Sequence, residues 1–184
     1  RIGGIFSSVS FRIVTSVTGP AGVVQVSPAS TSPTLTKLGN EGKTGGWFFR
    51  TITSDALQGT AAAKYAIDQG FSSLAIVHVN NDFGVNMLAE FRRAYEALGG
   101  KIVSATPYNP QQPSYAAEVT NALKGDPPAL YFIGYPGDGT TIVRTWIQQG
   151  GPQRFLLNDG MNAADFIKGV GPQFLANAFG TSSG

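Results

Sequence analysis

The 184-residue chain contains no cysteine, and this absence narrows its chemistry at once. Without cysteine there is no disulfide framework, no thiolate nucleophile and no cysteine-ligated metal site. Histidine is almost as scarce, since His78 is the only one. A Ser-His-Asp triad or a histidine metal site would therefore have to be built around His78. Its position inside the apolar run LAIVHV is more typical of a packed core side chain, so no metal site is expected.

Charge and long apolar runs are also scarce. Charged residues make up 13% of the chain, the net charge is +2, and the lysines are scattered along it. Because no basic stripe forms, nucleic acid is not expected as a partner. The longest apolar runs, such as LAIVHV (residues 74–79), are far shorter than the roughly 20 residues of a membrane-spanning helix. With 42% hydrophobic residues, the composition predicts one or two globular domains.

The nucleotide-binding glycine motifs are missing as well. Neither G-x-x-x-x-G-K-[ST] nor G-x-G-x-x-G occurs, and the nearest candidate, GYPGDG (residues 134–139), has the wrong glycine spacing. The sequence therefore disfavours catalysis and predicts no cofactor, which leaves an α/β hydrolase-type enzyme as the less favoured alternative.

What the chain does contain is an alternation of strand-like and helix-like segments. Strands are predicted at residues 2–6, 22–26, 47–51, 73–80, 101–108, 129–134 and 154–158. A helix is expected at residues 9–16, and further helices follow the later strands, two of them capped by Ser54 and Ser114. Strands that alternate with helices of this length indicate right-handed βαβ units, and hence a doubly wound parallel sheet.

Ligands of such sheets bind at the carboxyl ends of the strands, so the residues that follow each strand are the site candidates. The hydroxyl-rich stretch SPASTSP follows the second strand, and two further serines follow the first. Hydroxyl and backbone N–H groups suit a carboxylate, an acid suits an ammonium group, and aromatic rings suit an apolar side chain. The candidates of these three kinds are Ser7, Ser8, Ala29, Ser30, Thr31, Phe83, Tyr135 and Asp159.

Five stretches carry a family resemblance in their order and spacing: SPASTSP, FFRTITSDALQGTAAAKYA, VNNDFG, YFIGYPGDG and FLLNDGMN. Together they resemble the branched-chain amino-acid-binding proteins of ABC importers, which are type I periplasmic binding proteins. The resemblance implies an α/β fold with two doubly wound parallel-sheet lobes joined by a hinge. Residues 1–50 would form part of the first lobe, residues 51–178 the second lobe, and residues 179–184 a return crossing. Family members run to roughly twice this length, so a fragment or the ordered part of a longer protein is expected.

The resemblance also implies a function and a role for each site residue. Ser8, with Ser7 beside it, and Thr31 would bind a ligand carboxylate. The ligand's ammonium group would be bound by the carbonyl of Ala29 and the carboxylate of Asp159. The ligand's side chain would lie against the rings of Phe6, Phe83 and Tyr135. Two departures are visible, since the family commonly has tyrosine where this chain has Phe83, and relatives can have glutamate in place of Asp159.

A solute-binding protein of this kind is not an enzyme and needs no cofactor. It would capture an apolar amino acid or a related small carboxylate by hinge closure, and deliver it to an ABC permease in the membrane. It would act as a monomer in the periplasm, or outside the cell on a lipid anchor. The alternative within the same fold is a ligand-sensing regulatory or receptor module, in which closure signals to a partner protein.

Overall fold

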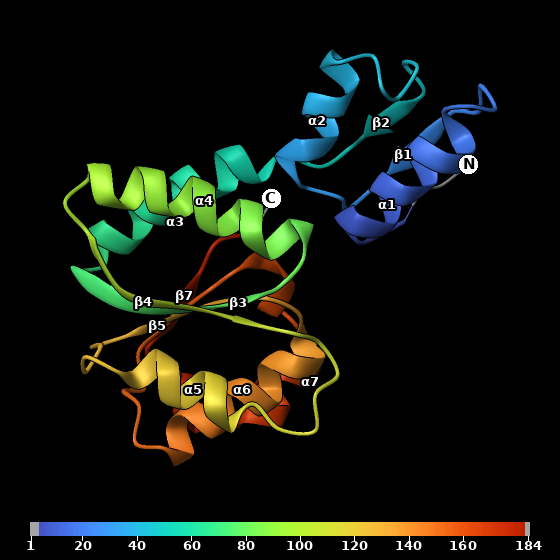
Figure 1. Ribbon diagram of the computed structural model, residues 1–184. Helices are drawn as coiled ribbons and strands as arrows, with labels where there is room; N and C mark the ends of the chain where they lie inside the picture. The colour runs from blue at the N-terminus through green and yellow to red at the C-terminus, as the bar shows by residue number, and fades with distance from the viewer. Residues whose placement is uncertain (1–3, 183–184) are drawn as a thin grey trace.

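The computed structural model describes residues 4–182 and divides their strands between two parallel sheets (Figure 1). Residues 4–50, here called the first lobe, carry the smaller sheet. The elements of the first lobe are α1 (Ser7–Ile13), the π-helical turn η1 (Val14–Thr18), β1 (Gln25–Ser27), α2 (Pro33–Asn40) and β2 (Phe48–Arg50). Strands β1 and β2 pair in parallel and form a sheet of only two strands.

Residues 55–180, here called the second lobe, carry a sheet of five strands. Its elements are α3 (Asp55–Asp68), β3 (Ser73–Val79), α4 (Asp82–Ala97), β4 (Lys101–Tyr108), α5 (Ala116–Leu123), β5 (Leu130–Ile133), α6 (Pro136–Gln148), β6 (Phe155–Leu157), the 3₁₀ turn η2 (Asp159–Met161), α7 (Ala164–Val170), the 3₁₀ turn η3 (Pro172–Leu175) and β7 (Ala178–Gly180). Within residues 4–182, no helix is both long enough and apolar enough to cross a membrane.

The five strands are all parallel and lie in the order β4-β3-β5-β6-β7. Helices α3 and α4 cover one face of this sheet, and α5, α6 and α7 cover the other (Figure 1). The chain runs outward from β3 to β4 and then returns to place β5 on the other side of β3. The order thus reverses between β3 and β5, which creates a crevice at their carboxyl ends. The doubly wound parallel sheet predicted from the sequence is confirmed.

Local sequence signals explain the regular elements of the second lobe. Strand β3 is apolar almost throughout and is buried from Leu74 to the end of the strand, as expected for a central parallel strand. Helix α4 begins after Asn81, whose side-chain oxygen accepts a hydrogen bond from the N–H of Gly84 at 3.0 Å. Its apolar face, with Met87 and Phe91, is buried in the core. Ser54 caps α3 in the same way, which confirms that prediction.

The start of the first lobe differs from the sequence prediction. Ile2 and Gly3 of the expected strand at residues 2–6 lie outside the described residues, and the rest of that segment forms no strand. In a sheet, the carbonyl groups of a strand accept hydrogen bonds from the backbone of a neighbouring strand. The carbonyl of Gly4 instead accepts hydrogen bonds from the hydroxyls of Ser10, Ser27 and Ser30 at 2.8–3.1 Å. The predicted strand was therefore wrong over its described part, and α1 begins directly after it.

Two neighbouring predictions needed new boundaries. The strand expected at residues 22–26 is confined to β1, because Gly22 has a left-handed φ of 63° and the next two valines are 40% exposed. The helix expected at residues 9–16 starts earlier, at Ser7, and passes into the π-helical turn η1. That turn is rich in β-branched residues, and Thr18 in it donates a hydrogen bond to the side chain of Gln25 at 2.8 Å.

The C-terminal end of the second lobe also extends further than expected. Residues 179–184 were assigned to a return crossing toward the first lobe. Phe179 and Gly180 instead belong to β7, where they pair with Leu156 and Leu157 of β6. The ring of Phe179 packs against Phe71 at a centroid distance of 5.9 Å, so this edge strand shares the core beneath α3.

Candidate functional site

A cavity of about 260 Å³ lies between the first lobe and the carboxyl edge of the second sheet. It is lined by Ile5, Phe6, Ser7, Ala29, Thr31, Phe83, Tyr135, Pro136, Asn158, Asp159 and Gly160. All the ligand-binding residues predicted from the sequence are in this set except Ser8 and Ser30. The structure therefore brings together, in one place, side chains that lie more than 100 positions apart in the chain.

The hydroxyl groups on the first-lobe side are held by neighbouring backbone. Ser7 is the first residue of α1, and its hydroxyl accepts a hydrogen bond from the N–H of Ser32 at 3.1 Å. Thr31 is 5% exposed and lies in the same loop. The guanidinium of Arg50 donates to the carbonyls of Ser30 and Ser32, at 3.2 and 3.0 Å, on either side of Thr31. These contacts fix the position of the loop that carries Thr31.

Ser8 and Ser30 have different surroundings from those predicted. The hydroxyl of Ser30 is buried, 2.8 Å from the hydroxyl of Ser10 and close to the carbonyls of Gly4 and Ile5. It ties the loop after β1 to the start of α1, so its role is structural. Ser8 is half-buried and does not line the cavity. Of the two neighbouring serines, only Ser7 lines the cavity.

Three aromatic rings form the apolar wall of the cavity. Phe83, which is 7% exposed, stacks on Tyr135 at a centroid distance of 5.7 Å. Phe6 meets Tyr135 edge to face at 4.7 Å, and this contact joins the first lobe to the second. The hydroxyl of Tyr135 accepts a hydrogen bond from the amide of Asn81 at 3.3 Å. Burial raises the pKa of Tyr135 above its usual value, so the phenol stays neutral.

The acidic end of the cavity is set by the residues that follow β6. Asp159 begins η2 and is half-buried. The preceding Asn158 is buried, and its amide both accepts from the N–H of Gly134 at 2.9 Å and donates to the carbonyl of Gly134 at 3.2 Å. This pair of bonds ties the end of β6 to the end of β5, and so fixes Asp159. Sequence reasoning missed Asn158, although its place directly after the apolar FLL strand was a usable signal.

A second acid, Asp55, lies next to the cavity-lining Thr31 and was also missed. Asp55 is the first residue of α3 and is fully buried, and its N–H donates to the carbonyl of Thr31 at 3.0 Å. Within the described part of the chain, neither of its carboxylate oxygens accepts a hydrogen bond of good geometry. Burial, reinforced by Asp159 and Asp82, raises the pKa of Asp55 to about 7, and the nearby Thr31 side chain and Arg50 offset this only in part.

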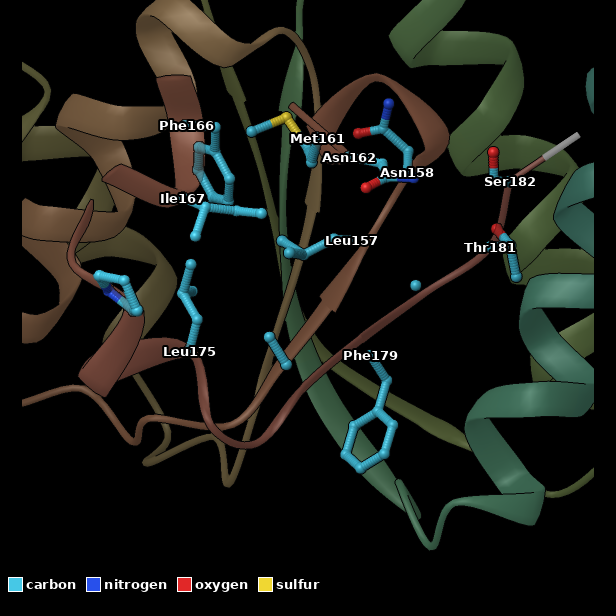
Figure 2. Close-up of a pocket in the computed structure, with 13 residues that line it drawn as sticks. Leu157, Asn158, Met161, Asn162, Phe166, Ile167, Leu175, Phe179, Thr181 and Ser182 are labelled. Atoms are coloured by element: carbon cyan, nitrogen blue, oxygen red, sulfur yellow. The ribbon is translucent and has the colours of Figure 1, made fainter. Parts of the chain in front are cut away.

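A larger cavity, of about 390 Å³, lies along β6, α7 and β7. Figure 2 shows Leu157, Met161, Phe166, Ile167 and Leu175 around it, with Asn158 and Asn162 at one end. Its lining, as far as the structure describes it, includes no acidic or basic side chain. This cavity therefore offers no acid to an ammonium group, whereas the smaller cavity contains Asp159.

A G-x-S-x-G pattern occupies residues 180–184 and places Ser182 just after β7. The only histidine, His78, belongs to β3 and is 6% exposed, with Nδ1 3.2 Å from the carbonyl of Val79. Strands β5 and β6 lie between β3 and β7, so three strand spacings of about 4.8 Å separate them. This histidine therefore cannot act as the base for Ser182.

The fold and the cavity together define a class of protein. A small polar and aromatic cavity between two α/β lobes, at the switch point of a parallel sheet, is the arrangement of a two-lobed solute-binding protein. The family model described as periplasmic binding protein matches residues 2–184, and the chain belongs to that family. The resemblance inferred from the five sequence stretches is thus confirmed at the level of the family.

Individual relatives agree with this assignment. The chain is 26% identical over 163 residues to a Leu/Ile/Val-binding protein homolog of Brucella melitensis, which covers 86% of this chain and 42% of the relative. It is 25% identical over 165 residues to a leucine-, isoleucine-, valine-, threonine- and alanine-binding protein of Pseudomonas aeruginosa, covering 89% of this chain and 43% of the relative. A leucine-binding protein of Thermotoga maritima superposes with a TM-score of 0.80 at 25% identity, covering 92% of this chain and 47% of that one. The chain thus spans less than half the length of these relatives.

Proposed function

We propose that the protein carrying this chain captures an apolar L-amino acid, or a small carboxylate of similar shape, in the cavity between the lobes. One observation carries the proposal. Hydroxyl groups of the first lobe face an acid and an aromatic wall of the second lobe across one small cavity. A volume of about 260 Å³ lies below the roughly 300–1,000 Å³ of drug-sized sites, so the ligand is small.

Each part of an apolar amino acid has a partner in this cavity. The carboxylate would lie against the hydroxyls of Ser7 and Thr31 and the N–H groups that open α1. The ammonium group would lie between the carbonyl of Ala29 and the carboxylate of Asp159. The aliphatic side chain of the ligand would pack on the stacked rings of Tyr135 and Phe83.

Binding would favour a closed arrangement of the lobes. Direct contacts between the lobes include the edge-to-face pair of Phe6 and Tyr135 and the hydrogen bond from the amide of Asn86 in α4 to the hydroxyl of Thr34 in α2 at 3.3 Å. A ligand that touches both lobes stabilises the closed state by its extra contacts there. The hinge would include residues 51–54 and the segment that follows β7. No bond of the ligand is made or broken, so the protein would not be an enzyme.

Closure would then be read by a membrane permease of an ABC importer. The protein would act as a monomer in the periplasm, or outside the cell on a lipid anchor. The support for this step is the family and the names of the relatives, which are binding proteins for leucine, isoleucine and valine.

Titration calorimetry on the natural protein that carries this chain tests the proposal. The panel would be L-leucine, L-isoleucine, L-valine, L-phenylalanine, 4-methylpentanoate, benzoate, D-glucose and ATP. We expect one site for an apolar amino acid or one of the small acids, with no chemical change in the recovered ligand. Binding of only the sugar or the nucleotide would refute the proposal. Delivery is tested separately, by uptake of labelled ligand in cells with and without the gene, and unchanged uptake would contradict it.

A further inference from the structure

We propose that Arg50 is a positioning residue that couples the ligand cavity to the hinge. Arg50 is not among the described residues that line the cavity, so it acts on the ligand through Thr31, which does line it. This inference rests on the proposed function and deepens it, because it names the side chain that links ligand binding to the angle between the lobes.

The first argument is the set of contacts made by the Arg50 guanidinium. Its Nη1 donates to the carbonyls of Ser30 and Ser32, at 3.2 and 3.0 Å, and its Nη2 donates to the hydroxyl of Thr36 in α2. The two carbonyls lie on either side of Thr31 in the chain. A guanidinium presents several donors in a fixed planar fork, whereas a lysine ammonium is a compact point charge on a flexible stem. Arg50 therefore holds the loop of Thr31 against β2 and α2 in a way that lysine cannot reproduce.

The second argument is the burial of the loop that Arg50 holds. This loop, residues 28–32, contains no helix or strand. Ser30 and Ser32 are 0% exposed, and Thr31 is 5% exposed. Buried backbone groups need hydrogen-bond partners, and a loop lacks the partners that a helix or a sheet supplies. Without the two bonds from Arg50 the loop is free to shift, and the hydroxyl of Thr31 shifts with it.

The third argument is that Thr31 is held from both sides of the hinge. Arg50 is the last residue of β2 and directly precedes the hinge segment, residues 51–54. On the other side of that segment, the N–H of Asp55 in α3 donates to the carbonyl of Thr31 at 3.0 Å. A rotation of the lobes about residues 51–54 must therefore move the loop relative to Arg50 or relative to α3. A ligand that fixes the hydroxyl of Thr31 favours one of these arrangements, which links binding to closure.

The geometry of Arg50 can be separated from its charge. Burial lowers the pKa of the guanidinium, and the nearby Asp55 carboxylate opposes this effect. Arginine nevertheless stays protonated near neutral pH. Lysine carries the same charge but lacks the fork of donors. Arg50→Lys therefore tests the geometry, and Arg50→Met removes both the geometry and the charge.

The test is titration calorimetry on the natural protein with L-leucine and 4-methylpentanoate, together with small-angle X-ray scattering at saturating L-leucine. The control is Arg93→Lys, at an exposed position of α4. We expect both Arg50 variants to weaken the two ligands by the same factor, about tenfold or more, because both ligands carry the carboxylate that Thr31 binds. The fall in the radius of gyration on saturation should be smaller than in the wild type, and the control should behave as the wild type. A role in stability alone would lower the melting temperature and leave affinity and closure unchanged, which would overturn the proposal.

A milder variant tests the same contacts if the Arg50 variants do not fold. Thr36→Val removes the hydroxyl that accepts from Nη2, at an exposed position of α2. Thr60→Val, which removes an exposed hydroxyl from α3, is the matched control. We expect Thr36→Val to weaken both ligands by a factor of about two to ten, and the control to leave both affinities unchanged.

The remaining outcomes separate this inference from the proposed function. Wild-type affinity and closure in Thr36→Val, and in every Arg50 variant that folds, would overturn the inference while leaving the proposed function intact. Full rescue by Arg50→Lys would assign the effect to charge alone and would overturn the inference as well. Wild-type protein that binds neither ligand nor any other apolar amino acid or small acid would overturn the proposed function itself.

Discussion

Replacing Asp55 by asparagine should change how the stability of the unliganded protein depends on pH. The pKa of Asp55 is raised to about 7 in the folded protein from 3.8, mainly by burial. Between these two values the folded state binds more protons than the unfolded state, so the free energy of unfolding falls as pH rises. This loss of unfolding free energy is absent below pH 3.8 and complete above about pH 7. A difference of about three pKa units corresponds to about 4 kcal/mol.

Asparagine has a similar shape but does not titrate, so Asp55→Asn should lack this loss. The difference in unfolding free energy between variant and wild type should therefore shift in favour of the variant, by up to about 4 kcal/mol, between about pH 4 and about pH 8. Urea unfolding followed by far-UV circular dichroism at a series of pH values measures it. Asp68→Asn, which removes only an exposed ion pair with Lys64, should run parallel to the wild type. Parallel curves for Asp55→Asn as well would refute the reasoning.

Three further predictions concern the site, the packing and the first lobe. Asp159→Ala should weaken L-leucine by about 2–5 kcal/mol without changing the melting temperature of the unliganded protein, and calorimetry showing equal affinity would contradict this. Gly59→Ala should destabilise the α3–α4 contact, because its Cβ would lie 2.8 Å from the Cβ of Glu90. Gly137→Ala, whose Cβ would meet nothing within 4 Å, should stabilise α6 by about 0.5 kcal/mol; thermal melts in which both variants shift the same way would count against the packing argument. In the isolated 184-residue chain, the backbone amides of the second lobe should be more protected against hydrogen exchange than those of the first lobe. The reason is that the two-stranded sheet of the first lobe leaves Phe49 55% exposed. Equal protection in both lobes would show that the first lobe is stable on its own.

The second lobe was predictable because its signals are local. The apolar run of β3, the cap at Asn81 and the spaced apolar residues of α4 each specify an element without reference to the rest of the chain. The first lobe was less predictable because a short strand exists only where a neighbour pairs with it. The segment before α1 is apolar and glycine-rich like a strand, yet the carbonyl of Gly4 faces hydroxyl groups in place of a strand.

The candidate site likewise contains some residues that local sequence signals predict and others that depend on distant neighbours. Phe83, Tyr135 and Asp159, which all line the cavity, could be placed together from the sequence because the carboxyl ends of parallel strands meet at one edge, and this rule needs only the strand positions. Ser30 follows the same rule but is turned into the protein, where its hydroxyl meets that of Ser10 at 2.8 Å. The sequence shows which hydroxyls are near the edge, whereas the direction in which each one points depends on packing between distant segments.

Asp55 is the clearest example of a residue whose surroundings local sequence signals do not predict. A serine followed by an aspartate at the start of a helix is an ordinary capping pattern, because an acid is favoured near a helix N-terminus. Asp82 and Asp159 are also first residues, of α4 and η2. Each acid is therefore unremarkable in its own segment. The parallel topology directs these helix starts to the same edge of the sheet, where burial raises the pKa of Asp55 and the two other acids raise it further. A common local preference, repeated on three elements, thus becomes a concentration of negative charge that suits the ammonium group of an amino acid.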